Sequence, residues 1–356
     1  MTTEGTKQHY LPACIIGRFS FEQEKRLRER RVFVLGRGKN KIFTQKPENL
    51  CMRRGMYDLR EYGGTIDEWQ YEDQLPDVLN KIENNIFPEL DTFIHVLVPY
   101  VTCLFMRGVD YELRQENIQE IRKLQSDGLI SEDNVNGSRM MHLQRLLAIV
   151  AAAQWTYRKT EGSLILPDTG LCIGHNGDKP AWLVPVGPNS LFEITPRKIG
   201  RIASWDASNK AWLPRWKFGS LNKGEVSELN VELQRQAYEW CFSDDEGLFT
   251  LPYKKLSKSK KASLMENVMR IDQCLTTHER VAHEFEWYSL SVIAAGHLSP
   301  LKVSRMNLNH FTYYPDKDRW TPSMPMFPDN LKPFKSGIHV DGRKLVLDLR
   351  CQDILF

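Results

Sequence analysis

Hydrophobic residues follow two different periods along this chain. Near the N-terminus, the β-rich runs 32–36 and 41–45 flank a glycine-rich turn over 36–40, and this pattern predicts a β-hairpin. From residue 75 to residue 159, apolar residues recur every three or four positions, as in Val78 and Ile82. That spacing predicts three or four packed helices, with a bend at Pro99.

The period shortens again after Lys159. Turn-rich separators divide this part into short predicted strands, with a further candidate at 199–205, and an apolar stripe predicts a helix over 225–242. Beyond it we expect a Lys-rich linker at 254–261, a helix-like stretch at 262–296 and a strand at 344–349. The predicted strands before the helix are 163–166, 171–174, 181–185 and 190–194.

The predicted fold class is α+β, with a basic N-terminal β-hairpin, a helical middle, a small sheet plus helix, and a mixed C-terminal extension. We expect residues 1–250 to form one domain and residues 251–356 to form the extension. Within the domain, the segments are 1–60 (basic β segment), 61–160 (helical) and 161–250 (small sheet and helix).

Composition favours a folded protein that does not span a membrane. The chain is 41% hydrophobic and 26% charged, which is enough apolar material for a core. The longest charge-free runs, Thr92–Met106 and Trp287–Leu301, contain 15 residues each and one or more prolines, short of the roughly 20 that a spanning helix needs. The N-terminus has no apolar leader, and seven scattered cysteines lack C-x-x-C spacing, so we expect a reducing, cytoplasmic location.

Charge is distributed unevenly. Residues 1–54 hold 13 Lys/Arg against 5 Asp/Glu, a balance of +8, so the rest of the chain carries −5 of the total +3. Clustered cations bind phosphates by releasing counterions, which predicts a nucleic-acid surface; solvated loops are the alternative. The residues assigned to this surface are Lys25, Arg26, Arg28, Arg37, Lys39, Lys254 and Lys255.

Three side chains are candidates for acid–base chemistry. His9 lies in a basic, irregular segment, where a neutral imidazole could exchange protons; pinning the N-terminus is its alternative role. Asp168 follows a predicted strand and could help hold a divalent cation, or could cap a turn. Glu83 flanks a buried helical stripe. No nucleophile elbow is present, so acyl-transfer hydrolysis has no support.

Several short motifs occur in an order that resembles a known family. Gln8–Pro12 followed by Gly17–Phe19, then Leu164–Gly170, and then Leu229–Asn230 with Phe242–Ser243 are similar to segments of the domain-of-unknown-function 4238 family. The resemblance spans residues 8–243. This chain reads Pro-Asp-Thr-Gly around Asp168, where members usually read Ser-Asp-Asn-Pro.

The resemblance implies a bacterial effector, because members include toxin-like genes of antiphage defence. On that basis a single pocket is expected to perform phosphodiester chemistry, with an unidentified cofactor that could be a divalent cation. A buried ion-pair network is the structural alternative. The expected roles are catalytic for His9, Glu83 and Asp168, phosphate-binding for Arg18 and Arg107, and supporting for Tyr10 and Asn230.

Three functions remain open at this stage. The first is a nuclease acting on DNA or RNA. The second is a non-enzymatic sensor or scaffold that binds a protein partner through the C-terminal extension. The third is a small-molecule or nucleotide-modifying enzyme, which would need a deep pocket.

Overall fold

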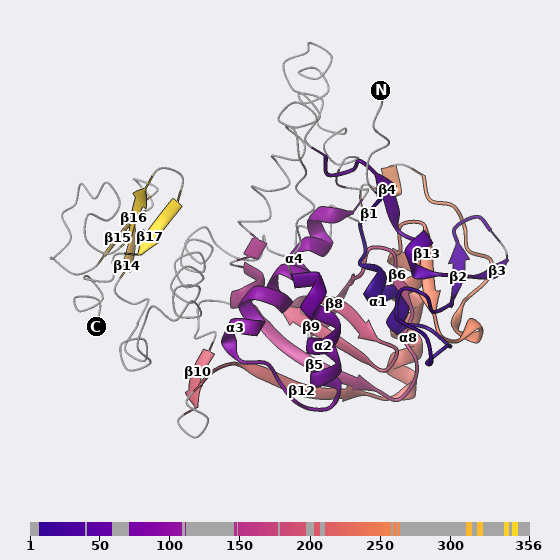
Figure 1. The fold of residues 1–356 in the computed structure, drawn as a ribbon, viewed down its shortest axis with the longest axis horizontal. Helices are drawn as coiled ribbons and strands as arrows, with labels where there is room; N and C mark the ends of the chain where they lie inside the picture. The colour runs from indigo at the N-terminus through magenta and orange to yellow at the C-terminus, as the bar shows by residue number, and fades with distance from the viewer. Residues whose placement is uncertain are drawn as a thin grey trace, which may run out of the picture.

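A computed structural model shows the α+β fold that the sequence predicts (Figure 1). It contains helices, two larger sheets and several two-stranded sheets. The residues described are 7–39, 41–58, 71–108, 111, 146–147, 149–176, 179–196, 203–206, 211–257, 259–261, 263 and four strands between 311 and 347.

The N-terminal segment contains the predicted hairpin. Strand β2 (Val32–Gly36) pairs antiparallel with β3 (Ile42–Gln45), as the alternating pattern indicates. Before it lie β1 (Lys7–His9) and α1 (Ala13–Arg18). After it, the short helix η1 (Pro47–Asn49) leads into β4 (Met52–Arg54), which pairs with β1.

The hairpin is part of a four-stranded antiparallel sheet that joins the two ends of the domain. Its order is β3-β2-β13-β6, in which β13 (Trp240–Ser243) lies between β2 and β6 (Leu166–Pro167). Residues near 35, 167 and 241 are therefore neighbours. Figure 1 shows the indigo N-terminal strands beside the orange strand β13.

Helices form the middle of the domain. They are α2 (Tyr71–Glu83), α3 (Leu90–Thr92), the π-helical turn η2 (Phe93–Leu97) and α4 (Val98–Arg107). Pro99 lies in the first turn of α4, directly after the π-helical turn. Of the helices in the described ranges, only Leu90–Arg107 is long and apolar enough to span a membrane, and 78% of it is buried, as in a core helix.

A five-stranded sheet lies beneath these helices. Its order is β12-β5-β9-β8-β7, with β12 parallel to β5 and every other pair antiparallel. The prediction that the helical segment continues to residue 160 is wrong, because residues 154–160 form a central strand. The strands are β5 (Gln154–Thr160), β7 (Cys172–Asn176), β8 (Lys179–Gly187), β9 (Ser190–Thr195) and β12 (Trp216–Leu221).

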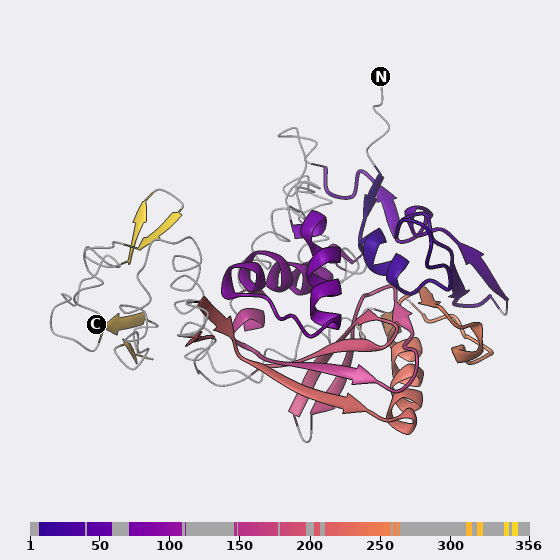
Figure 2. The same cartoon turned by 60° about the horizontal axis from the view of Figure 1, so that its bottom comes forward.

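Aromatic rings fill the space between the helices and this sheet. Trp155 of β5 packs against Phe93 and Phe192, with ring centroids 5.0 and 5.3 Å apart. Phe105 of α4 meets Trp182 of β8 at 4.9 Å. Figure 2 shows the purple helices on one face of the sheet, and the buried rings explain that arrangement, because each covers a large apolar area.

Helix α8 (Lys223–Gln236) begins at Asn222, which forms a capping box with Glu225. The predicted end at Phe242 is wrong, because the helix stops at Gln236 and residues 240–243 form β13. Those residues pair with β2 and β6, so sheet pairing prevails over the helical period.

The remaining described elements are short. β10 (Ala203–Asp206) pairs with β11 (Ala211–Pro214), and the helix η3 (Glu246–Leu248) follows β13. Near the C-terminus, β14 (Phe311–Tyr314) pairs with β15 (Arg319–Pro322), and β16 (Ile338–Asp341) pairs with β17 (Lys344–Leu347). The last of these confirms the strand predicted at 344–349. The predicted helix-like stretch 262–296 lies outside the described residues, apart from residue 263.

Gly17 provides a test of this packing. A Cβ at Gly17 would overlap the backbone carbonyl of Leu27, so Gly17→Ala should lower the unfolding free energy by about 1–3 kcal/mol despite alanine's higher helix propensity. Urea denaturation measures the change. The matched substitution Gly162→Ala meets only Val226 at 3.6 Å and should be nearly neutral. Equal effects at the two positions would contradict the close approach of Leu27.

Candidate functional site

Arg107 and His9 meet at one end of α2. The Arg107 side chain is 2% exposed, and it donates one hydrogen bond to the His9 carbonyl and another to the Glu72 carboxylate. It also donates to the hydroxyl of Tyr71 at 3.1 Å, and Tyr57 donates its hydroxyl to the Arg107 carbonyl at 2.8 Å. The guanidinium expected to bind phosphate is therefore paired inside the protein.

The His9 imidazole lies next to this ion pair. Burial lowers the pKa of His9, and the positive charge of Arg107 lowers it further. Its Nε2 atom is buried and makes no hydrogen bond within the described part of the chain. His9 is therefore neutral near pH 7. Tyr10, the next residue, is held by its backbone N–H, which donates to the Cys51 carbonyl at 2.8 Å.

Arg18 and Glu83 form a second cluster at the other end of α2. Arg18 donates its Nε to the Val186 carbonyl at 2.7 Å, one Nη to Asn80 at 2.6 Å and the other to Glu83 at 2.5 Å. Ser190 donates its hydroxyl to Glu83 at 3.3 Å. Arg18 thereby joins α1, α2 and the end of β8.

The two clusters are too far apart to share one pocket. Glu72 and Glu83 both belong to α2 and are separated by 83 − 72 = 11 residues. At the rise of an α-helix, that separation is about 16 Å, and three turns place both carboxylates on the same side. The structure brings His9 together with Arg107, and Arg18 together with Glu83, but it does not bring the two pairs together.

Asp168 belongs to a third place in the fold, beyond the end of α8. Its Oδ1 accepts the backbone N–H of Tyr238 at 2.7 Å, and its Oδ2 accepts those of Glu239 and Trp240 at 2.8 and 3.1 Å. Asp168 as a whole is 2% exposed. Both oxygens are thus occupied by backbone donors, the arrangement of an aspartate that caps a turn.

Burial and hydrogen bonding act on Asp168 in opposite directions. Loss of water raises its pKa to about 7, because desolvation outweighs the three N–H donors that favour the charged form. A carboxylate with that pKa could serve as a base if it were accessible. Here it is sealed by residues 238–240, and its partners give it a structural role.

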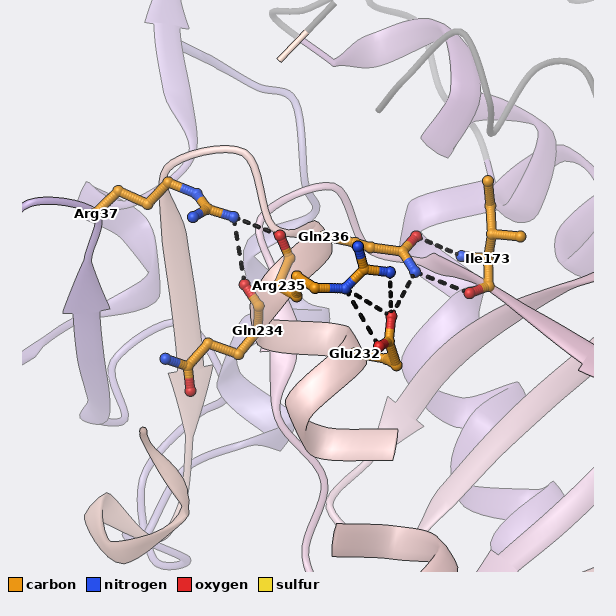
Figure 3. Close-up of polar contacts among 6 residues, drawn as sticks. All are labelled: Arg37, Ile173, Glu232, Gln234, Arg235 and Gln236. Carbon is orange, nitrogen blue, oxygen red and sulfur yellow. Dashed lines mark hydrogen bonds and ion pairs between the residues drawn. The ribbon is translucent and has the colours of Figure 1, made fainter. Parts of the chain in front are cut away.

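Three amide side chains of α8 each accept a hydrogen bond from a backbone N–H and donate one to a backbone carbonyl, as a neighbouring strand would. Asn230 accepts the N–H of Ile165 at 2.8 Å and donates to the carbonyl of Ser163 at 2.9 Å. Gln236 accepts from and donates to the backbone of Ile173 in β7 at 2.8 and 2.9 Å, as Figure 3 shows. Gln234 does the same with Thr250 at 2.9 and 2.6 Å. Asn230, expected as a supporting site residue, thus supports the fold.

Arg37 holds the C-terminal end of the same helix. Its guanidinium donates to the carbonyls of Arg235 and Gln234 at 2.6 and 3.5 Å (Figure 3). It also donates to the carbonyl of Ala237 at 2.7 Å. It also donates to the carbonyl of Lys254 at 3.1 Å. A cation at the negative end of a helix dipole is stabilising. Arg37 is therefore engaged by backbone carbonyls and does not contribute a free charge to the expected nucleic-acid surface.

The other cations of that expected surface differ in their surroundings. Lys39 lies over the ring of Trp240, 4.8 Å from its centroid. Lys254 and Lys255 are exposed after the end of η3. The remaining three, Lys25, Arg26 and Arg28, are exposed in a loop between α1 and β2. We call residues 20–31 the basic loop.

Hydrogen bonds give the basic loop a fixed shape. Ser20 donates its hydroxyl to the Arg31 carbonyl at 2.6 Å, and Glu22 accepts the N–H of Arg31 at 2.9 Å. Arg30 donates to the carbonyls of Lys25 and Gln23 at 2.7 and 2.8 Å. The loop is thus closed at its base and braced across its middle before any ligand binds.

Sequence reasoning missed two kinds of residue here. Glu72 is not among the residues that the sequence analysis singles out, although its spacing of three helical turns from Glu83 places it on the same side of α2. Gln234 and Gln236 carry no local signal, because their partners at 250 and 173 are far away in the chain.

Neither a metal centre nor a relative points to a function. Among the residues that the structure describes, no group of three or more His, Cys, Asp and Glu side chains could hold a metal ion. Comparisons with family models, with curated proteins and with solved structures find no match to this chain. Membership of the domain-of-unknown-function 4238 family stays a prediction.

The role of Asp168 can be measured directly. Asp168→Asn replaces an acceptor oxygen with an NH₂ group that faces backbone N–H donors, and it should lower the unfolding free energy by about 3 kcal/mol. Urea denaturation measures this loss. Asp77→Asn is the control. Asp77 is exposed on α2, so this substitution should leave the unfolding free energy almost unchanged. An Asp168→Asn protein as stable as the parent would contradict the capping role.

The raised pKa of Asp168 predicts how stability depends on pH. The native carboxyl holds its proton up to about pH 7, whereas the unfolded one releases it near 3.8. Between these values the unfolded state binds fewer protons, so this group favours the native state at low pH and the benefit decreases as pH rises. The stability advantage of the parent over Asp168→Asn should therefore shrink between about pH 4 and pH 7. An advantage that grows with pH would contradict it.

Proposed function

We propose that the protein binds nucleic acid through the basic loop. The observation that carries this proposal is a pre-shaped loop that exposes two arginines, neither of which pairs with a carboxylate in the described part of the chain. Arg26 and Arg28 are exposed and form no ion pair with any described residue, whereas Lys25 pairs with Glu22 at 2.9 Å. Because hydrogen bonds brace the loop before binding, its backbone loses little freedom when Arg26 and Arg28 contact phosphates.

An exposed aromatic ring in the same loop favours single strands. Phe21 is 42% exposed, and its ring lies 4.6 Å from that of Phe33 at an angle of 33°. Contact with Phe33 therefore holds the Phe21 ring in an exposed position. Unpaired bases stack on such rings, while the bases of a duplex are already stacked on each other.

The charge distribution agrees with this placement. Residues 1–54 carry +8 against −5 for the rest of the chain, so the electrostatic attraction for a polyanion is concentrated in the segment that contains the basic loop. An effector role in defence is compatible with such binding. Hydrolysis of the bound strand stays a prediction. The separation of about 16 Å between the two arginine clusters favours binding over hydrolysis in one shared pocket.

Neutralising the two unpaired arginines tests the proposal. The double substitution Arg26→Gln/Arg28→Gln should weaken binding of single-stranded RNA or DNA at least about tenfold at low salt. The slope of log affinity against log salt concentration should fall by about 1.4, the value for two lost phosphate contacts on a single strand. Fluorescence anisotropy with labelled oligonucleotides measures both quantities.

The matched control removes two exposed charges elsewhere. Lys159→Gln/Lys223→Gln has the same change in net charge, and both lysines are exposed outside the basic loop. It should bind almost as the parent does. The proposal fails if both double variants lose affinity equally, or if the parent does not bind either nucleic acid at low salt.

Stacking on Phe21 has its own test. Phe21→Leu keeps an apolar side chain but removes the ring, so it should weaken binding of single strands about tenfold and leave duplex binding nearly unchanged. Phe218→Leu is the control, because Phe218 is 63% exposed on β12, outside the basic loop. Equal effects on single and double strands would contradict a stacking role.

A further inference from the structure

The five-stranded sheet has two edges, and they are protected differently. At β7, the side chain of Gln236 occupies the backbone N–H and carbonyl of Ile173. At the opposite edge, β12 pairs only with β5, and no described strand lies on its outer side. Figures 1 and 2 show β12 as the outermost strand. An open edge presents alternate backbone N–H and carbonyl groups to a further strand.

One face of this edge is apolar. Phe218 of β12 is 63% exposed, and Ile86, in the loop that follows α2, is 60% exposed. The ring of Phe87 lies 4.7 Å from that of Phe218 in an edge-to-face arrangement. A ring this exposed on an edge strand is unusual, because edge strands are commonly protected by charge. Residues of an added strand that point to this face would cover the Phe218 ring.

The other face of the edge is cationic. Lys217 is exposed, and no described residue forms an ion pair with it. Arg158 of β5 extends across β12 at Gly219: a Cβ on Gly219 would lie 2.7 Å from its Nη1 atom. Arg158 contacts Glu193 through its Nε at 2.5 Å, and its Nη atoms make no hydrogen bond within the described ranges.

We propose that β12 accepts an extended segment of a partner protein as a sixth strand, and that this segment alternates acidic and apolar residues. Its acidic side chains meet Lys217 and Arg158, and its apolar side chains cover Phe218. Backbone pairing gives affinity in this binding mode, while alternate side chains give specificity.

Charge decides between this occupant and a second copy of the chain. If two β12 strands paired with each other, Lys217 and Arg158 of one copy would face the same cations of the other on one side of the joined sheet. Like charges on neighbouring strands are destabilising. An acidic segment instead supplies a counter-ion for Lys217 and a second partner for Arg158, whose Nη atoms make no hydrogen bond within the described ranges.

A designed peptide tests the proposal with the full-length chain. The probe is a fluorescein-labelled peptide of about ten residues that alternates Glu and Val, and its mate alternates Lys and Val. We expect saturable binding of the acidic peptide and at least about tenfold weaker binding of the basic one. Hydrogen exchange should show slower exchange of amides in 216–221 when the acidic peptide is present.

Matched variants connect binding to this edge. Lys217→Glu/Phe218→Ser changes only exposed side chains, and it should abolish binding of the acidic peptide without changing the melting temperature. Lys223→Glu/Val231→Ser makes the same change in charge and also replaces an exposed apolar side chain, on α8, and it should bind as the parent does.

Three results would overturn the proposal. They are no saturable binding of the acidic peptide, binding that survives Lys217→Glu/Phe218→Ser, and a dimer of the parent protein that this double substitution dissociates. The last result would assign the edge to a second copy. None of these measurements involves the basic loop, so the proposal for nucleic acid stands or fails separately.

Discussion

The C-terminal end of α8 is the point on which the rest of the fold depends. A helix that ends inside a protein leaves its last carbonyls without hydrogen-bond partners. The N–H groups of the turn that follows also need partners. Here a guanidinium and a carboxyl group supply the missing hydrogen-bond partners. Arg37, from the hairpin, binds the carbonyls, and Asp168, next to β6, binds the N–H groups of residues 238–240. The chain can therefore leave the helix and enter β13, which joins the N-terminal hairpin to the centre of the domain.

This arrangement gives a physical meaning to the scattered polar residues that the sequence singles out. Arg18, Arg107, Asp168 and Asn230 each connect segments that are far apart in the chain. Buried charges require partners, and these side chains have them within the protein. The structural alternative of an ion-pair network fits this geometry better than one catalytic pocket does. We propose that a ligand contacts a different part of the molecule, the exposed cations of the basic loop, which hydrogen bonds brace at its base and across its middle.

The sequence predicted those parts of the fold that local pattern controls. The β2–β3 hairpin and α2 follow from period and turn chemistry. Strand β5 was missed because it follows directly after a helical alanine run and its apolar positions fit either period. The end of α8 was missed because long-range pairing decides the conformation of residues 240–243. For the candidate site, residue type indicated which polar side chains are important. The partners of Arg107 and Asp168 could not be predicted, because they are distant in the chain and no local pattern specifies them.

Hydrogen exchange at the end of α8 tests the central claim most directly. If Asp168 holds the turn, the backbone amides of Tyr238, Glu239 and Trp240 should exchange only when the whole domain unfolds. Their opening free energies would then equal the global unfolding free energy measured by urea denaturation. Faster exchange of these three amides through local opening, while the sheets stay protected, would contradict the account.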